Sequence, residues 1–237
     1  MRTFLQGEVL TANDLNTVLT TGISTEPWAF SNTVTFSNTA NFSKPTTFTA
    51  NVSIANTSVF YAPGTIVQVN NTLIVNSSSF GLSTTYTNFI DVPGLSVSIT
   101  PRSANSKIYI TARVFGEIQP QTSNWDTVYA IKRNGTPINL PPQPGTLLIG
   151  HHMGALTYYA DDSNSTPEPV FFDMIDSPAN TSVLTYNVSI ASTSASNYYL
   201  NRCVNAGTSG GFERGTSTIT VFEIAQWFMI YISQFHC

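Results

Sequence analysis

The acidic side chains best placed to do chemistry are close together in the second half of the chain. Asp161 and Asp162 are adjacent in the stretch DDSNSTPEP, and Glu168, Asp173 and Asp176 follow. Paired carboxylates hydrolyse glycosides when they face each other about 5 Å or about 6.5–9.5 Å apart in a groove. The DDSNSTPEP composition is instead typical of a surface loop. The calcium-loop pattern Asp-x-Asp-x-Asp-Gly is also absent, so we expect neither catalysis nor a calcium site.

The histidines and cysteines give no metal-binding pattern within one chain. His151 and His152 are adjacent, and neighbouring residues of a strand point to opposite faces, so one chain cannot chelate with both. Three copies of either histidine around a three-fold axis would be a metal site, but a structural role in a loop or interface is the simpler interpretation. Cys203 and Cys237 are predicted to be free thiols, and no zinc-type spacing occurs. We predict no metal and no cofactor.

Other catalytic signatures are missing from the sequence. There is no GxSxG, no phosphate-binding P-loop and no dinucleotide fingerprint. The glycine-rich segment Gly207–Gly211 lies between expected strands and is interpreted as a hairpin loop. We therefore predict that the chain is not an enzyme.

Aromatic side chains beside loop-like sequence are better candidates for recognition. Tyrosine and tryptophan dominate protein hot spots, and their ring faces also stack on sugars. One tyrosine of each Tyr-Tyr pair should face the core. The candidate receptor-binding residues are Trp125, Tyr158, Tyr159, Tyr198, Tyr199, Asp161 and Asp162.

The composition favours sheets and argues against two kinds of partner. Charged residues are 9% of the 237 residues, against about 25% in ordinary soluble domains. Ser, Thr, Asn, β-branched and aromatic residues take their place, as in strands. The net charge is −4 and no basic cluster occurs, so nucleic acid is not an expected partner. No run of about 18 apolar residues is present, so we expect no membrane span.

Residues 1–29 carry the one clear helix signal. Thr11 is a good N-cap with Asp14 at the third helical position, and Leu10 and Leu15 occupy the positions of a hydrophobic staple. The predicted helix covers about residues 12–20.

Residues 30–65 contain a six-residue repeat, which we call the shaft. In extended chain, every repeat points its first residue to the same face, so one chain presents an apolar stripe that it cannot bury alone. Three chains around one axis would bury it; a monomeric meander with coincidental spacing is the alternative. The first positions of the repeats are Phe30, Phe36, Phe42, Phe48, Ile54 and Phe60.

Residues 66–225 contain many short strand patterns separated by turn residues, and Asn134-Gly135 is a strong hairpin signal. The predicted fold is all-β: a short N-terminal helix, a trimeric shaft and an antiparallel, jelly-roll-like β-sandwich head. Residues 226–237 are apolar and are predicted to be a final strand or a plug in the trimer interface. The predicted strands are Thr65–Val75, Leu95–Thr100, Lys107–Phe115, Val128–Arg133, Leu147–Tyr159, Val170–Ile175, Ser182–Ala191, Tyr198–Cys203 and Ser217–Ile224.

The opening GEVLTANDLN, Gly7 to Asn16, resembles the attachment segment of phage tail-fibre and related virion proteins. The resemblance implies virion attachment through Gly7, Glu8, Val9, Leu10 and Leu15.

The head resembles a phage structural domain found at fibre C-termini. The matching motifs, in order, are LSVSITPRSANSKIYITARV (Leu95–Val114), AIKRNGTPI (Ala130–Ile138), DSPANTSVLTYNVSI (Asp176–Ile190), NR (Asn201-Arg202) and STITVFEIA (Ser217–Ala225).

These resemblances imply a tail-fibre-type protein on the exterior of the virion, on the tail or the capsid. The expected partners are two further copies of the chain, another virion protein at the N-terminus, and a host-surface glycan or protein. A capsid decoration (cement) protein is the first alternative and a tailspike depolymerase the second.

Overall fold

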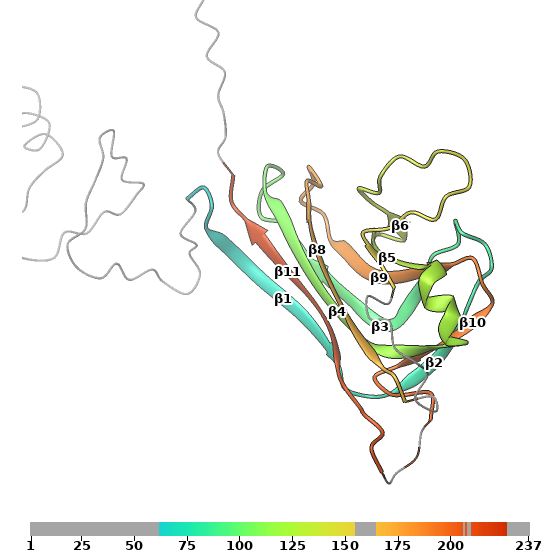
Figure 1. Cartoon of the computed structure of the whole chain (residues 1–237). Coiled ribbons are helices and arrows are strands. Elements are labelled where there is room, and N and C mark those ends of the chain that lie inside the picture. The colour runs from blue at the N-terminus through green and yellow to red at the C-terminus, as the bar shows by residue number, and fades with distance from the viewer. Residues whose placement is uncertain (1–61, 155–164, 206, 208–209, 227–237) are drawn as a thin grey trace, which may run out of the picture. The chain divides into compact units, whose positions relative to one another are not determined.

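The computed structural model describes residues 62–154, 165–205, 207 and 210–226. These residues form two antiparallel sheets that pack face to face (Figure 1), which confirms the predicted all-β sandwich. The predicted N-terminal helix, the shaft residues Phe30 to Phe60 and the apolar tail after Gln226 lie outside the described residues. No helix in the described part is long and apolar enough to cross a membrane.

The first sheet, sheet A, is built around the long strand β4. Strand β8 pairs with one edge of β4, while β11 and β10 pair end to end with its other edge, and β1 and β2 lie outside them. Its strands are β1 (Ile66–Ile74), β2 (Ser78–Leu82), β4 (Lys107–Gln119), β8 (Glu168–Asp176), β10 (Ser196–Leu200) and β11 (Ser217–Ile224).

The second sheet, sheet B, has the order β3-β9-β5, and the free edge of β5 carries the short strands β6 and β7. A 3-10 helix, η1 (Gln121–Asp126), leads into β5. The strands are β3 (Ile90–Ile99), β5 (Thr127–Arg133), β6 (Thr136–Pro137), β7 (His152–Met153) and β9 (Leu184–Ser192).

The core lies between the sheets and follows from the two-residue period of the strands. In β4 the even-numbered residues from Ile108 to Val114 are buried, whereas the odd-numbered residues between them are only partly buried. Strand β11 alternates in the same way, with Ile219 and Val221 inside.

The open side of the sandwich is closed by side chains of β1 that reach the edge of β3. Gln68, Asn70 and Thr72 each donate a hydrogen bond to a backbone carbonyl of β3 or its C-terminal end, at 2.7, 2.8 and 2.6 Å. Residues two apart share a face of a strand, so alternate positions of β1 make a ladder of polar bonds. This ladder occupies carbonyls that would otherwise face solvent.

The Asn134-Gly135 hairpin is confirmed, since both residues have positive φ (50° and 84°) between β5 and β6. The predicted strand Tyr198–Cys203 is wrong in its second half: β10 ends at Leu200, because Asn201 adopts the left-handed conformation (φ 59°).

The long strand predicted over Leu147–Tyr159 is also wrong in its described part, where only His152–Met153 pairs with β5. Between Tyr129 and Lys132, this edge of β5 has no strand beside it. The Ile131 carbonyl accepts from the Ile138 N–H, and the Ile131 N–H donates to the imidazole of His151.

Candidate functional site

The predicted receptor-binding residues fall into three groups. Trp125, on η1, has 61% of its surface exposed, and Tyr199 is half-buried on β10. Tyr198 is buried, with 1% exposed. The remaining candidates lie outside the described residues: Tyr158, Tyr159, Asp161 and Asp162.

Tyr198 belongs to the core, so the prediction that it contributes to a recognition surface is wrong. Its ring lies 5.5 Å from that of Phe80 and edge-on to Tyr129, and the two tyrosine side chains are hydrogen-bonded. Burial raises the pKa of Tyr198 well above its ordinary value, and the adjacent Tyr129 raises it further. A side chain at Gly116 would stand 2.6 Å from this ring, so the sandwich needs glycine there.

Tyr199 faces outward, but its ring already has partners. The hydroxyl donates a hydrogen bond to the Gln119 side-chain oxygen at 3.1 Å, and the guanidinium of Arg202 lies 4.6 Å from the ring centre. This cation–π contact occupies one ring face. At 61% exposed, Trp125 has the most accessible surface of the described aromatic candidates.

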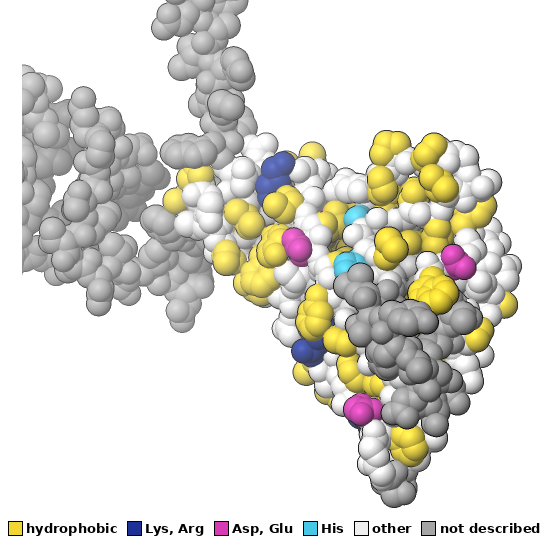
Figure 2. Space-filling view, viewed as in Figure 1, with side chains coloured by type: hydrophobic (Ala, Val, Ile, Leu, Met, Phe, Trp, Pro, Cys, Tyr) yellow, Lys and Arg dark blue, Asp and Glu magenta, His cyan; other side chains and the backbone are white. Residues whose placement is uncertain are grey.

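An open depression lies beside β5, with a volume of about 430 Å³. Figure 2 shows histidine side chains among hydrophobic ones on this face, with few charged groups around them. Trp125 lies at the same end of β5 as this depression, because η1 leads directly into the strand and Met153 pairs with Val128. The lining residues are Val128, Pro141, Leu148, Ile149, Gly150, His151, His152 and Met153.

Residues 139–150, which we call the proline loop, form one wall of the depression. The side-chain amide of Asn139 anchors the start of the loop by donating to the Ile175 carbonyl at 3.1 Å. Gln143 donates to the Leu147 carbonyl at 2.6 Å across the tip. At the end of the loop, a side chain on Gly150 would meet the Val128 Cβ at 2.7 Å and the Tyr129 carbonyl at 2.8 Å. Glycine thus lets the loop return close against β5.

The imidazole of His151 closes the base of this loop. Its Nδ1 accepts a hydrogen bond from the Ile131 backbone N–H at 3.0 Å, and its Nε2 lies 3.0 Å from the Ile138 carbonyl. An N–H can only donate and a carbonyl can only accept, so the ring is neutral with its proton on Nε2. Burial lowers the pKa of His151, although the carbonyls of Ile138 and Asn139 act in the opposite direction.

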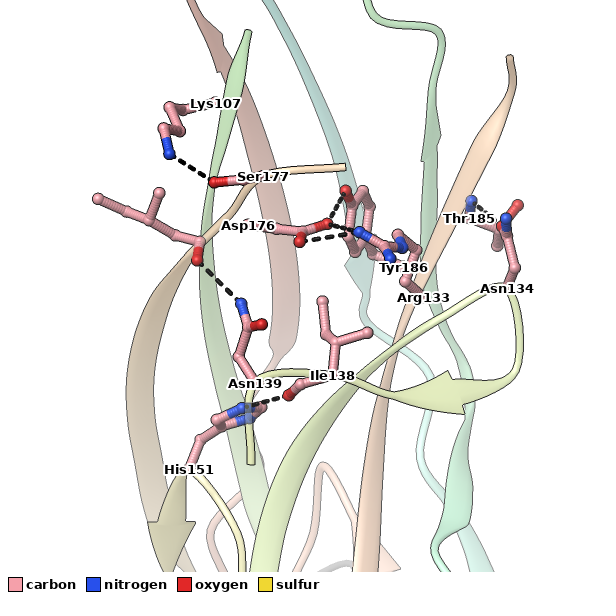
Figure 3. A network of polar contacts seen from close by, with 11 residues as sticks. Lys107, Arg133, Asn134, Ile138, Asn139, His151, Asp176, Ser177, Thr185 and Tyr186 are labelled. Carbon is pink, nitrogen blue, oxygen red and sulfur yellow. Dashed lines mark hydrogen bonds and ion pairs between the residues drawn. The ribbon is translucent and has the colours of Figure 1, made fainter. Parts of the chain in front are cut away.

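A partly buried ion pair lies on the other side of β6 from His151 (Figure 3). Arg133 of β5 donates to both carboxylate oxygens of Asp176 at 2.9 and 2.7 Å, and the Tyr186 hydroxyl donates to the same carboxylate at 2.7 Å. Burial raises the pKa of Tyr186, and its bond to the Asp176 carboxylate raises it further. Asp176 therefore joins the end of β8 in sheet A to β5 and β9 in sheet B.

The other acidic residues of that region do not form a paired site with Asp176. Asp173 is exposed on the outer face of β8, and Glu168 is half-buried with its pKa raised by burial. The buried Glu117 and Glu223 are bound by hydroxyl and backbone N–H donors: Thr166 and Val204 for Glu117, and Ser106 and Arg102 for Glu223. These carboxylates hold loops to sheet A.

The described residues contain no group of three or more His, Cys, Asp or Glu side chains that could hold a metal ion. Within one chain, both ring nitrogens of His151 are already engaged by backbone groups. Cys203 is a free, buried thiol, as predicted, and burial raises its pKa. Cys237 lies outside the described residues.

The sequence missed both the ion pair and the role of His151. Arg133 and Asp176 are 43 positions apart, and no local pattern connects them. The two adjacent histidines are evident in the sequence, but only the fold places His151 opposite the backbone N–H of Ile131.

Comparison with known proteins gives little further information. No protein-family model matches the chain, and no curated protein matches it. Among solved structures, one match is a chain from the structure of infectious bursal disease virus Gx strain, with 9% sequence identity and a TM-score of 0.30. The match covers 67% of this chain and 37% of that chain, so this chain spans well under half of its length.

Proposed function

We propose that this chain is a fibre-type virion protein that is anchored through its N-terminus and presents a β-sandwich head to the host surface. The observation that supports this proposal is the order of parts along one chain. The GEVLTANDLN segment comes first, the six-residue repeat follows, and a sandwich with its own complete core begins directly after the repeat. In this arrangement we expect the head to fold without the preceding segments and to act as a binding module.

The recognition surface that we propose is the depression beside β5 together with Trp125. The depression is open, and its lining is mostly apolar with two histidines. The exposed Trp125, on η1 just before β5, is the residue type that anchors interfaces and stacks on rings. The partner that we propose is a glycan of the host surface.

The proposed assembly is a homotrimer held by the shaft. The apolar first positions of the repeats, Phe30 to Phe60, would form the shared core of three chains. Three weak sites on one body would bind a repetitive surface about a hundred-fold more tightly than one site, or better, when they engage together.

The first test is the light-scattering mass of the purified chain, full-length and without residues 1–65. A full-length mass near three times 25.7 kDa, with a monomeric head after truncation, supports the trimeric shaft. A full-length monomer rules it out and favours the capsid decoration protein, whose arm would become ordered on the virion.

The second test is binding of the full-length protein to an array of bacterial surface polysaccharides. We expect Trp125→Ala to weaken binding at least ten-fold. Val183→Ala is the matched control, because Val183 is 62% exposed between β8 and β9, away from the depression, and it should leave binding unchanged. Equal binding by both variants would show that Trp125 is not part of the site. Release of reducing ends from the polysaccharides would instead indicate a depolymerase.

A further inference from the structure

The free edge of β5 is bonded in an unusual way at Ile131. Along this edge, the Tyr129 carbonyl accepts from the His151 N–H at 2.8 Å, and the Ile131 carbonyl accepts from the Ile138 N–H at 3.2 Å. No strand continues between β6 and β7 to receive the Ile131 N–H. The Nδ1 atom of His151 takes this place at 3.0 Å.

The same ring joins the two ends of the proline loop. Ile138 immediately precedes the loop and His151 immediately follows it, and the ring bonds the Ile138 carbonyl through Nε2 (Figure 3). The ring also stacks on Phe172 of β8, with ring centres 6.4 Å apart and planes at 20°. One imidazole therefore ties the loop to both β5 and β8.

A proton added to this ring has no acceptor. Protonated Nδ1 would point its N–H at the Ile131 N–H, so two donors would face each other and the half-buried edge of β5 would lose its partner. An unpaired buried donor is costly, and the backbone relieves the conflict most easily by moving the loop, whose tip is exposed.

The surroundings offer little to stabilise an imidazolium. Arg133 and Asp176 are already paired, Lys132 is bound to Asp91, and Asp173 lies on the outer face of β8. Within the described part of the chain, neither ring nitrogen of His151 bonds a carboxylate. The titratable or charged groups on the packed elements are Tyr129, Lys132 and Arg133 of β5, His152 of β7, and Glu168, Asp173 and Asp176 of β8.

We propose that His151 is a pH-sensitive latch: its neutral imidazole holds the proline loop against β5, and protonation releases the loop and opens the depression. The latch regulates the recognition surface, and in that sense it rests on the proposed function. An acidic environment would then change the shape of the surface that meets the host.

The test is hydrogen exchange of the full-length protein, read on peptides that cover 128–133 and 138–153 between pH 7.5 and 5.0 and corrected for the intrinsic rate. Opening should rise up to ten-fold per pH unit below about 6.5, until the lowered pKa of the ring is passed. Strands β4 and β11 should keep their protection over this range.

Two matched variants identify the histidine. His151→Gln keeps one acceptor and one donor but cannot titrate, so its exchange should be independent of pH. His152→Gln removes the neighbouring half-buried histidine and should keep the wild-type pH profile. A wild-type profile in His151→Gln, or a flat profile in His152→Gln, overturns the latch.

A measurement on the wild type covers the case in which His151→Gln fails to fold. Nitrogen-15 spectra of the histidine rings at pH 7.5 should show His151 with its proton on Nε2, assigned by comparison with His152→Gln and His236→Gln. A proton on Nδ1, or titration at or above pH 6.5, overturns the proposal. None of these measurements uses a ligand, so a failed glycan array and a failed latch are distinguishable.

Discussion

Asp176 shows how a buried charge is accommodated in a sandwich with very few charged residues. It is 2% exposed, and its carboxylate accepts from Arg133 and Tyr186. A buried carboxylate persists only when its oxygens are bonded; here one guanidinium nitrogen of Arg133 contacts both oxygens, and the Tyr186 hydroxyl donates to one of them. The pair therefore fixes where the end of β8 meets sheet B.

Replacing Asp176 by alanine should destabilise the head by about 3 kcal/mol, because it leaves the Arg133 guanidinium and the Tyr186 hydroxyl without their shared acceptor. The Arg133 side chain is 30% exposed, so water recovers part of the loss. Urea unfolding followed by tyrosine and tryptophan fluorescence measures the change. The control is Asp173→Ala, an exposed carboxylate of the same strand, which should change stability by less than about 0.5 kcal/mol. Equal losses of stability in Asp176→Ala and Asp173→Ala would contradict the structural role of Asp176.

Glu168 should reduce stability at neutral pH. Burial raises the pKa of Glu168 in the folded state above the ordinary 4.5. The protonated side chain therefore contributes fully to the free energy of unfolding below pH 4.5, and this contribution is lost as the pH rises through the folded pKa. Glu168→Gln mimics the neutral acid, so it should raise the urea midpoint at pH 7 and have little effect at pH 4.

Glu213 provides a control of opposite sign. Hydrogen bonds from the Cys203 thiol, the Glu213 backbone N–H and the Ser165 hydroxyl lower the pKa of Glu213. The ionised side chain therefore contributes to the free energy of unfolding above pH 4.5, and this contribution is lost as the pH falls through the lowered pKa. Glu213→Gln should lower the urea midpoint at pH 7. If both variants shift the midpoint in the same direction, burial is not the cause of the Glu168 effect.

At the scale of elements, the proline loop depends on one position without a side chain. Gly150 brings the returning chain against β5, where an added Cβ would meet the Val128 Cβ at 2.7 Å and the Tyr129 carbonyl at 2.8 Å. The rigid strand cannot yield, so the loop must move.

Gly150→Ala should therefore destabilise the head by about 1–3 kcal/mol, the usual range for overpacking, and should increase proteolysis at the loop tip. Thermal unfolding and limited digestion by thermolysin measure the two effects. Gly211→Ala is the control, since a Cβ there meets nothing within 4 Å. Unchanged digestion of Gly150→Ala would mean that the loop tolerates displacement from β5.

The sequence predicted those elements whose signals are local. Alternation in Ile108 to Val114 and in Ile219 to Val221 identified β4 and β11, and Asn134-Gly135 identified the hairpin. Strand β2 (Ser78–Leu82, SSFGL) was missed, because serine and glycine give little strand signal. The depression and the His151 bonds were not predictable, because they depend on how the proline loop and β7 lie against β5, which no local pattern encodes.

At the scale of the whole molecule, both sheets depend on β11. It pairs with β1 on one side and β4 on the other, and it supplies Ile219 and Val221 to the core. A chain that ends at Gln226 should keep a single cooperative unfolding transition, because it retains every strand that the structure describes. A chain that ends at Gly215 should not fold, since β1 loses the strand it pairs with and β4 loses its partner along Lys107–Arg113 of one edge. Circular dichroism during urea titration measures both, and a folded chain ending at Gly215 would contradict this view.

The pairing of β1 with β11 also affects when the head can fold during synthesis. Gln68 bonds Glu223 across 155 positions of sequence. At roughly 5–20 residues per second on the ribosome, β1 waits about 8–30 seconds for its partner to be synthesised. During that interval the backbone N–H and C=O groups of β1 have no strand beside them, and such an unpaired strand edge is a template for pairing with another chain.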